Sequence, residues 1–331
     1  MTILSSELKF YKSATVTDTA ANGGRMSANL ITSGVVQNVF PNVLSAERST
    51  GSIKYRKLFF KVANDADETL YSPLFYLFAP TAGGDWIVFF EGTQTDIQSD
   101  ITGSERIYGA GTLSSSVSAA GTVLVINVED SSITGIIQAG DTLHITDKLS
   151  PSSTSGNEET VIVGSVNSVS GTEVTVTVTS GLLNSYAAGS SVSSVLGVGD
   201  LKCSVDNWVE TGAFTYNEST YPVLCDNIGT IEQTWTLTFS SSTVFTVSGN
   251  TVGSVGSGNT TTDFSPTNTN FSKPYFTLEF EGWGGTPAAG NTLVFQTHPA
   301  SVPLWEKRVV PAGCSSIAGN NVYLVAEGET L

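Results

Sequence analysis

The chain has 331 residues and a formal net charge of −16, with 40% apolar and 13% charged residues. Its length exceeds what one hydrophobic core usually serves, so we expect two or three domains. Recurrent β-branched runs such as Thr122–Val128 exclude a chain that is flexible linker throughout. The low charged share, offset by Ser, Thr, Gly and Asn, is typical of extended all-β proteins.

The N-terminal part begins with few periodic segments. The stretch 17–34, with its glycine pair, indicates turns and an extended arm. The run IKYRKLFFKV predicts a strand over Ile53–Val62, and aromatic-rich runs predict two more at Leu74–Phe78 and Trp86–Phe90. We therefore expect residues 1–108 to form an N-terminal arm and a β domain.

The composition changes at residue 109. Residues 109–197 contain one aromatic residue, Tyr186, and are rich in Ser, Thr and Val. Alternation of apolar and polar residues predicts strands at Thr122–Val128 and 173–180. We expect a small β domain that is inserted between two parts of a larger one.

Aromatic residues return in 198–331, which we expect to form a C-terminal β domain that stands alone or packs with the N-terminal domain as one larger unit. The stretch 233–249 predicts a hairpin, 254–270 a long polar loop, and 275–280 a strand. Helical periodicity is nearly absent. The expected fold class is all-β, with two or three β-sandwich-like or barrel-like domains, an extended N-terminal arm and a β-rich insertion.

The positive charges are concentrated near the N-terminus. Residues 1–66 contain eight basic and four acidic residues, a net charge of +4, whereas residues 67–331 carry −20. A basic segment attracts acidic protein surfaces and gives association its steering and register. We expect this segment to contact neighbouring subunits, and the candidate residues are Arg25, Arg48, Lys54, Arg56, Lys57 and Lys61.

Single-stranded nucleic acid is the alternative partner of this segment. Basic and aromatic residues interleave in 55–61, as they do in proteins that bind single strands. The net charge of −20 on the remaining residues would repel a polyanion. We therefore favour acidic protein over nucleic acid as the partner.

Few residues in the sequence point to catalysis. The two histidines, His144 and His298, come with no placed nucleophile or acid, and we expect them to be exposed strand and turn residues. The sequence has no phosphate-binding glycine loop and no CxxC motif. We expect a non-enzymatic protein without a cofactor and assign no catalytic, cofactor-binding or metal-binding residue.

One acidic cluster leaves a metal site open. Residues 64–68 (Asn-Asp-Ala-Asp-Glu) offer oxygen ligands, but they lack the central glycine and terminal glutamate of a calcium-binding EF-hand loop. A turn between two strands explains the same residue types, and we prefer that interpretation. Whether the cluster binds Ca²⁺ is open at this point.

The cysteines and the N-terminus bear on the compartment. Cys203, Cys225 and Cys314 have no metal-type spacing, and we favour reduced thiols over a Cys203–Cys225 disulfide. The N-terminal sequence lacks the basic and apolar regions of a signal peptide. No apolar run approaches the roughly 20 residues of a membrane-spanning helix. We expect synthesis in the cytosol and no membrane insertion.

Six peptides together carry a resemblance to a known family. They include TDTAANGGRMSANL, DNWVETG and GWGGTPAAGNTL, and they span 17–41, 44–70, 90–111, 205–212, 221–239 and 282–313. These peptides resemble virion structural proteins of tailed bacteriophages, especially Mu-like transposable siphophages. The resemblance implies a part of the virion, assembled in the host bacterial cytoplasm with copies of itself and other phage structural proteins. It brings no motif of known enzymatic or binding role.

Several functions are compatible with these features. The first is a non-enzymatic structural subunit of the tail tip or baseplate, which assembles through its basic N-terminal region against acidic neighbours. The second is a head decoration or head–tail connector protein. The third is a receptor- or glycan-binding module whose 109–197 domain meets a host surface receptor, and the last is an enzyme that degrades surface polysaccharide.

Overall fold

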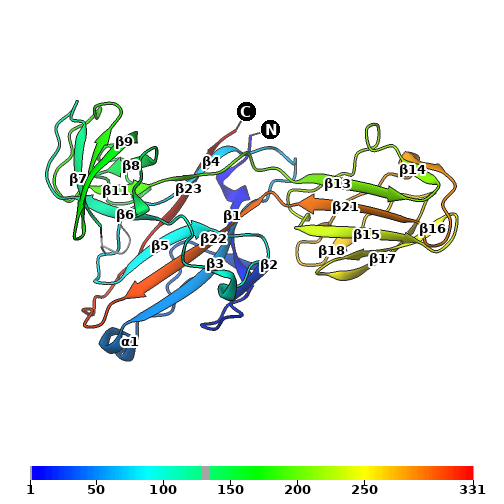
Figure 1. The fold of residues 1–331 in the computed structure, drawn as a ribbon, viewed down its shortest axis with the longest axis horizontal. Helices are drawn as coiled ribbons and strands as arrows, with labels where there is room; N and C mark the ends of the chain where they lie inside the picture. The colour runs from blue at the N-terminus through cyan, green and yellow to red at the C-terminus, as the bar shows by residue number, and fades with distance from the viewer. Residues whose placement is uncertain (1, 129–134, 331) are drawn as a thin grey trace.

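The computed structural model describes residues 2–128 and 135–330, and most of its regular structure is β-strand. The strands form three groups along the long axis of the molecule (Figure 1), which we call the barrel, the central unit and the distal unit. The helices in this part of the chain are short: α1 (Ser45–Thr50) and the 3-10 turns η1 (Ser5–Glu7), η2 (Gln98–Asp100) and η4 (Phe280–Gly282). None of them is long and apolar enough to cross a membrane. The expected all-β fold class is confirmed.

The central unit is built on an antiparallel sheet of five strands. In spatial order they are β5 (Trp86–Glu91), β22 (Ser301–Val310), β3 (Ser52–Val62), β1 (Leu8–Thr15) and β2 (Gly23–Ile31). Strand β22 comes from near the C-terminus and inserts between two N-terminal strands, with Trp305 opposite Lys57 and Leu304 opposite Leu58. The strand predicted from the run Ile53–Val62 therefore has a partner strand on each side.

A smaller sheet covers one face of the central sheet. Its strands are β12 (Leu196–Gly197), β4 (Tyr71–Leu77) and β23 (Leu324–Glu329). Apolar side chains from both sheets form the core between them, and they include Phe60, Val62, Phe75, Phe89 and Leu304. Each of these five side chains is at most 1% exposed. Burial of apolar surface contributes roughly 25 cal/mol per Å², and it is the main source of stability for such a two-layer unit.

The barrel is made of six antiparallel strands that close on themselves. In order they are β6 (Tyr108–Leu113), β7 (Val123–Val128), β10 (Glu173–Val178), β9 (Glu158–Ser170), β8 (Thr142–Thr146) and β11 (Ser191–Ser194), and β11 pairs back with β6. Alternate residues of β7 and β10 point inward to a core of aliphatic side chains. Strand β6 also pairs with β5, so the barrel wall continues into the central sheet. Both strands predicted in this region are confirmed.

The distal unit contains a five-stranded antiparallel sheet. Its strands are, in order, β13 (Ser204–Thr211), β21 (Thr292–His298), β15 (Gln233–Phe239), β16 (Val244–Gly249) and β17 (Gly253–Asn259). Two short pairs accompany it: β14 (Phe214–Tyr216) with β20 (Trp283–Gly285), and β18 (Thr267–Asn268) with β19 (Lys273–Pro274). An aromatic core that includes Trp235, Phe239, Phe245, Phe276 and Phe295 lies against the sheet.

Two expectations for this region need correction. The predicted hairpin over 233–249 is present as β15 and β16, but the expected polar loop 254–270 begins with a strand, β17. The expected strand 275–280 makes only single bridges, from Thr277 to Leu224 and from Leu278 to Phe264. Residues 275–278 alternate between buried and half-buried positions, and this explains their strand-like pattern. Among the residues that the structure describes, no partner strand runs along them, so they form single bridges only.

Both ends of the chain belong to the central unit. Half of the segment 17–34 that was expected to be an extended arm forms β2, which pairs with β1 at the sheet edge, whereas 16–22 and 32–44 have no helix or strand. Gly23 begins β2 with φ +107°, and a Cβ there would lie 2.7 Å from the Trp305 ring. In the C-terminal part, β13–β21 form the distal unit, whereas β22 and β23 return to the central sheets.

Candidate functional site

The six cations expected to contact other subunits come from three elements. Arg25 lies on β2, Arg48 on α1, and the remaining four on β3: Lys54, Arg56, Lys57 and Lys61. Side chains alternate between the two faces of a strand. Lys54 and Arg56 therefore lie on one face of the central sheet, and Lys57 and Lys61 lie on the other.

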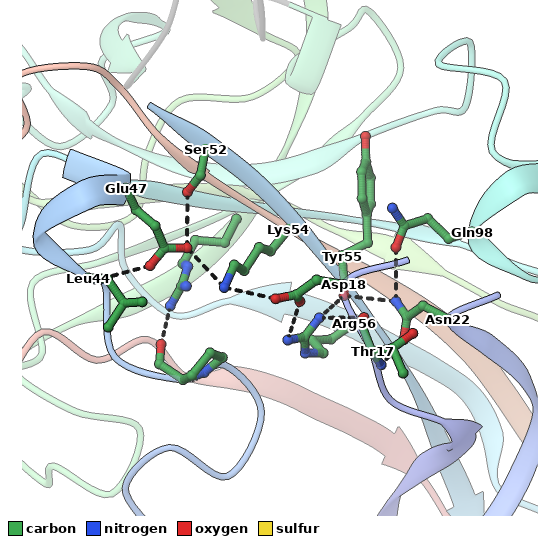
Figure 2. A network of polar contacts seen from close by, with 12 residues as sticks. Thr17, Asp18, Asn22, Leu44, Glu47, Ser52, Lys54, Tyr55, Arg56 and Gln98 are labelled. Carbon is green, nitrogen blue, oxygen red and sulfur yellow. Dashed lines mark hydrogen bonds and ion pairs between the residues drawn. The ribbon is translucent and has the colours of Figure 1, made fainter. Parts of the chain in front are cut away.

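On the first face, two carboxylates bind Lys54 and Arg56 (Figure 2). Lys54 Nζ lies 2.9 Å from Asp18 Oδ2 and 2.9 Å from Glu47 Oε1, and Arg56 Nη2 lies 2.7 Å from Asp18 Oδ1. Burial alone would raise the pKa of Asp18, but its hydrogen bonds and the two positive charges outweigh burial and lower that pKa. The network fastens the segment before β2 and helix α1 to the sheet.

Residues 32–44, which we call the strap, cross the same face. The Phe40 ring centre lies 5.5 Å from the Arg56 guanidinium carbon and 4.9 Å from that of Arg308. Arg308 Nη1 also donates a hydrogen bond of 2.7 Å to Pro41 O. A cation–π contact contributes about 0.5–2 kcal/mol, so the Phe40 ring and the Pro41 carbonyl together attach the strap to the sheet.

On the opposite face, Lys57 is fully buried. Its Nζ forms an ion pair of 2.5 Å with Asp96 and donates hydrogen bonds to Gly24 O at 2.7 Å and to Asp96 O at 2.9 Å. Asp96 also accepts a hydrogen bond from Trp305 Nε1 at 2.8 Å. Burial lowers the pKa of Lys57, and the charges of Asp96 and Asp100 partly oppose that effect. Lys57 therefore joins β3 to β2 and to the loop after β5.

Lys61 is also fully buried, and its Nζ has no hydrogen-bond partner in the described part of the chain. It lies 5.2 Å from the centre of the Phe271 ring, at the contact between the central and distal units. Burial lowers the pKa of Lys61 to about 8, although Cys203 and Asp226 act in the opposite direction. A buried amine with a lowered pKa is a reactive group.

These placements change the expected role of the cations. Arg56, Lys57 and Lys61 are at most 7% exposed and contact groups of their own chain, so they are not presented to a neighbouring subunit. Arg48 is half-buried and donates a hydrogen bond to Val43 O at 3.2 Å. Of the six, Arg25 alone is exposed, and it donates to Thr251 Oγ1 at 3.3 Å. The basic N-terminal region mainly holds its own unit together.

Both histidines lie in environments that their sequence context did not indicate. His144 was expected to be exposed but is 4% exposed, and its ring stacks on Tyr76 with 4.2 Å between centres. His298 ends β21, and its two ring nitrogens lie 2.9 Å from Glu232 Oε2 and 3.0 Å from Asp206 Oδ1. Burial lowers the pKa of His298, but these two carboxylates outweigh burial and raise it.

The acidic cluster 64–68 forms the turn that we preferred. Asn64 Oδ1 accepts hydrogen bonds from the backbone N–H groups of Ala66 and Glu68 at 3.1 Å and 3.0 Å, and Asp67 has φ +53°. Asp65 forms an ion pair with Lys273 at 2.7 Å. Within residues 2–128 and 135–330, no group of three or more His, Cys, Asp or Glu side chains is placed to hold a metal ion.

A cavity of about 180 Å³ lies where the central and distal units meet. Polar residues from both units and aromatic residues of the distal unit line it, and they include Arg25, Gln94, Glu232, Asn270, Phe271 and Tyr275. One guanidinium and one carboxylate give the lining a balanced charge. Hydrogen-bonding groups beside aromatic rings are the usual composition of a small-ligand pocket.

The outer side of β17 is a free sheet edge. This strand ends the distal sheet and pairs only with β16 among the described strands. It has no charged residue and no proline, the two side-chain features that natural edge strands use most against unwanted pairing, although a bulge at Val255 interrupts its register. Its N–H and C=O groups are therefore available to another strand.

Comparison of the chain with protein-family models, with curated proteins and with solved structures finds no match.

Proposed function

We propose that this chain is a non-enzymatic structural subunit of a tailed-phage particle, in the tail tip or baseplate. It assembles in the host bacterial cytoplasm with copies of itself and with other phage structural proteins. The six resembling peptides support this proposal, and so does the arrangement of three β units along one axis, because linear β units offer many sheet edges and faces to neighbours. The cations Arg56, Lys57 and Lys61 of β3 give this proposal no support, because they are buried within the chain's own central unit.

The observation that carries the proposal is the neutral edge of the distal sheet. Residues 233–262 contain no ionisable side chain, and they include β15, β16 and the edge strand β17. Elsewhere a net charge of −16 makes copies of this chain repel one another. An uncharged, unpaired strand is where a neighbour can approach without that repulsion, and strand addition there would join subunits through backbone hydrogen bonds.

The experiment that tests the proposed location is imaging of a labelled virion. An epitope inserted in the exposed loop 151–156 of the barrel, at the far end from β17, is detected with gold-labelled antibody on purified particles. We expect the label at the tail end. Label on the head would replace the tail-tip assignment by the head decoration or connector alternative, and absence of the chain from purified particles would overturn the structural role.

A second candidate function, a receptor- or glycan-binding module, is favoured by the cavity between the units. Sugar hydroxyls suit the planar hydrogen-bonding groups of Arg25, Glu232 and Asn270, and the Tyr275 ring offers an apolar face. Titration calorimetry with lipopolysaccharide oligosaccharide of the host tests this function. Binding should weaken about tenfold in Asn270→Ala if one hydrogen bond of typical strength is lost. Absence of any binding to the wild-type chain would remove this candidate.

A further inference from the structure

Two of the three cysteines meet at the base of the distal unit. Cys203 lies in the segment that leads into β13, and Cys225 lies between β14 and β15. The backbone of Cys203 is hydrogen-bonded to the side chain of Asn227, two residues after Cys225, and the two thiols act on each other's pKa. Cys203 is 7% exposed, and Cys225 is half-buried, so a small reagent can reach the pair from the side of Cys225.

The backbone around both cysteines is held independently of the thiols. Asn227, which is fully buried, accepts a hydrogen bond from Cys203 N at 2.9 Å through its side-chain oxygen. Its own N–H donates to Asp67 Oδ1 at 2.6 Å, and its side-chain NH₂ donates to Glu68 O at 2.9 Å. Asn227 thus joins the Cys203 segment, the Cys225 loop and the central unit. A disulfide requires two cysteines whose backbones lie side by side, and Asn227 holds the segments of Cys203 and Cys225 together.

Two cations lie close enough to the thiols to act on them electrostatically. Lys61, the buried amine without a hydrogen-bond partner, acts on Cys203, and His298 acts on Cys225. Contact between the two thiols, as the largest cause, lowers the pKa of Cys225 and raises that of Cys203. Thiolate is the form that attacks a disulfide. Cys225 is the more exposed of the two cysteines, so a disulfide reagent meets it first: Cys225 is the attacking residue, and Cys203 is the resolving residue.

We propose that Cys203 and Cys225 form a redox-sensitive pair, which is reduced in the cytosol and closes to a disulfide when the chain meets a disulfide oxidant. Oxidised glutathione supplies the chemistry. The Cys225 thiolate attacks one glutathione sulfur, the glutathione disulfide breaks, and one glutathione thiolate leaves. Cys203 loses its proton to solvent and attacks Cys225 Sγ, which releases the second glutathione. Two electrons and two protons thus pass from the protein dithiol to glutathione.

Closure would cross-link residues 203 and 225 around β13 and β14. A cross-link restricts the unfolded chain, so the oxidised distal unit should resist unfolding better than the reduced one. This inference is independent of the proposed particle location. It gives the chain one state while it is made in a reducing cytosol and a more stable state in oxidising surroundings.

The experiment uses the full chain. Wild-type protein is incubated with oxidised glutathione, denatured, alkylated and analysed by intact mass and peptide mapping, with Cys314→Ser as a control that keeps the pair. We expect the number of free thiols to fall from three to one, with one peptide cross-link between Cys203 and Cys225. Cys203→Ala should instead stop at a glutathione adduct on Cys225.

Two outcomes would overturn the proposal. One is a wild-type chain that keeps three free thiols after oxidation, and the other is a chain that carries glutathione on both residues without a cross-link. If Cys203→Ala does not fold, the peptide map of the wild-type chain alone decides, because it reports directly whether the two residues are joined.

Discussion

The Lys57 side chain has no exposed surface, and its ammonium group is bound by Asp96 and by two backbone carbonyl oxygens. Glutamate at this position would place a second carboxylate beside Asp96 in the interior. Because breaking a buried ion pair leaves an uncompensated charge, we expect Lys57→Glu to lower the free energy of unfolding by about 3–5 kcal/mol. Urea unfolding followed by tryptophan fluorescence measures the change.

The matched control is Lys202→Glu, which makes the same charge change at an exposed side chain. We expect it to alter stability by less than about 1 kcal/mol. If Lys57→Glu unfolded like the wild-type chain and failed only to enter particles, Lys57 would be a contact between subunits, as the charge pattern first indicated.

Glu306 gives the central sheet a pH dependence with a definite sign. Burial raises the pKa of Glu306 from 4.5 to about 7, so the folded chain holds this proton more tightly than the unfolded chain. The resulting stabilisation is complete below pH 4.5 and is lost as the pH rises to about 7. We expect Glu306→Gln to match the wild type near pH 4.5 and to exceed it by about 3 kcal/mol above pH 7.

Urea unfolding of both chains across this pH range measures the difference. Glu329→Gln removes one negative charge at an exposed position and corrects for the general effect of a less acidic chain. A Glu306→Gln curve that ran parallel to the wild-type curve from pH 4.5 to pH 8 would contradict the assignment.

The sequence identified the cluster of cations but could not predict their burial. The run 53–62 mixes basic and apolar residues in a way that fits a half-exposed strand, on which lysine side chains reach water. Its burial arises because β22, from the other end of the chain, pairs along β3 and places Trp305 opposite Lys57. Local patterning carries no information about such a non-local partner, and the same reason explains why His144 was expected to be exposed.

At the scale of elements, the strap is held by few contacts. None of residues 32–44 is buried, and Phe40 contacts the guanidinium groups of both Arg56 and Arg308. We expect Phe40→Ala to lower the free energy of unfolding by about 1–3 kcal/mol and to speed proteolysis within the strap. Limited proteolysis with mass mapping locates the cleavage sites.

Val36→Ala is the control, since Val36 is 79% exposed and lies in the same strap. Its cleavage rate should equal that of the wild type. Equal cleavage of the Phe40→Ala and wild-type chains would show that other contacts hold the strap.

Most elements with strict alternation were predictable from sequence. The strands in 122–128 and 173–178 and the hairpin 233–249 follow from period-2 patterns, and the strand in 53–62 follows from its aromatic and β-branched residues. Strand β17 was missed because GSVGSGN has the composition of a loop, and its pairing comes from β16 rather than from its own propensity. The barrel closure between β6 and β11 is likewise a property of tertiary structure.

At the scale of the whole molecule, the distribution of charge limits where copies can meet. The edge strand β17 is neutral in a chain of net charge −16. Lysines at Ser254 and Ser257, which are both exposed on this strand, would place positive charge on the edge and block strand addition. We expect wild-type protein to self-associate as concentration rises in sedimentation velocity experiments, and Ser254→Lys/Ser257→Lys to remain monomeric.

Thr154→Lys/Ser155→Lys makes the same charge change on an exposed loop of the barrel and serves as the control. It should associate as the wild type does. Equal association of the edge variant and the wild type would show that copies meet elsewhere on the surface.

Incorporation into the virion is the most direct measurement of whether the chain assembles through the edge strand β17. Phage are produced with the wild-type chain, with Ser254→Lys/Ser257→Lys or with Thr154→Lys/Ser155→Lys, and purified particles are assayed for the chain by quantitative immunoblot. We expect the wild type and the barrel variant in particles at equal levels, and the edge variant folded in the lysate but missing from particles. Equal levels of all three chains, or absence of the wild-type chain, would contradict a subunit that assembles through β17.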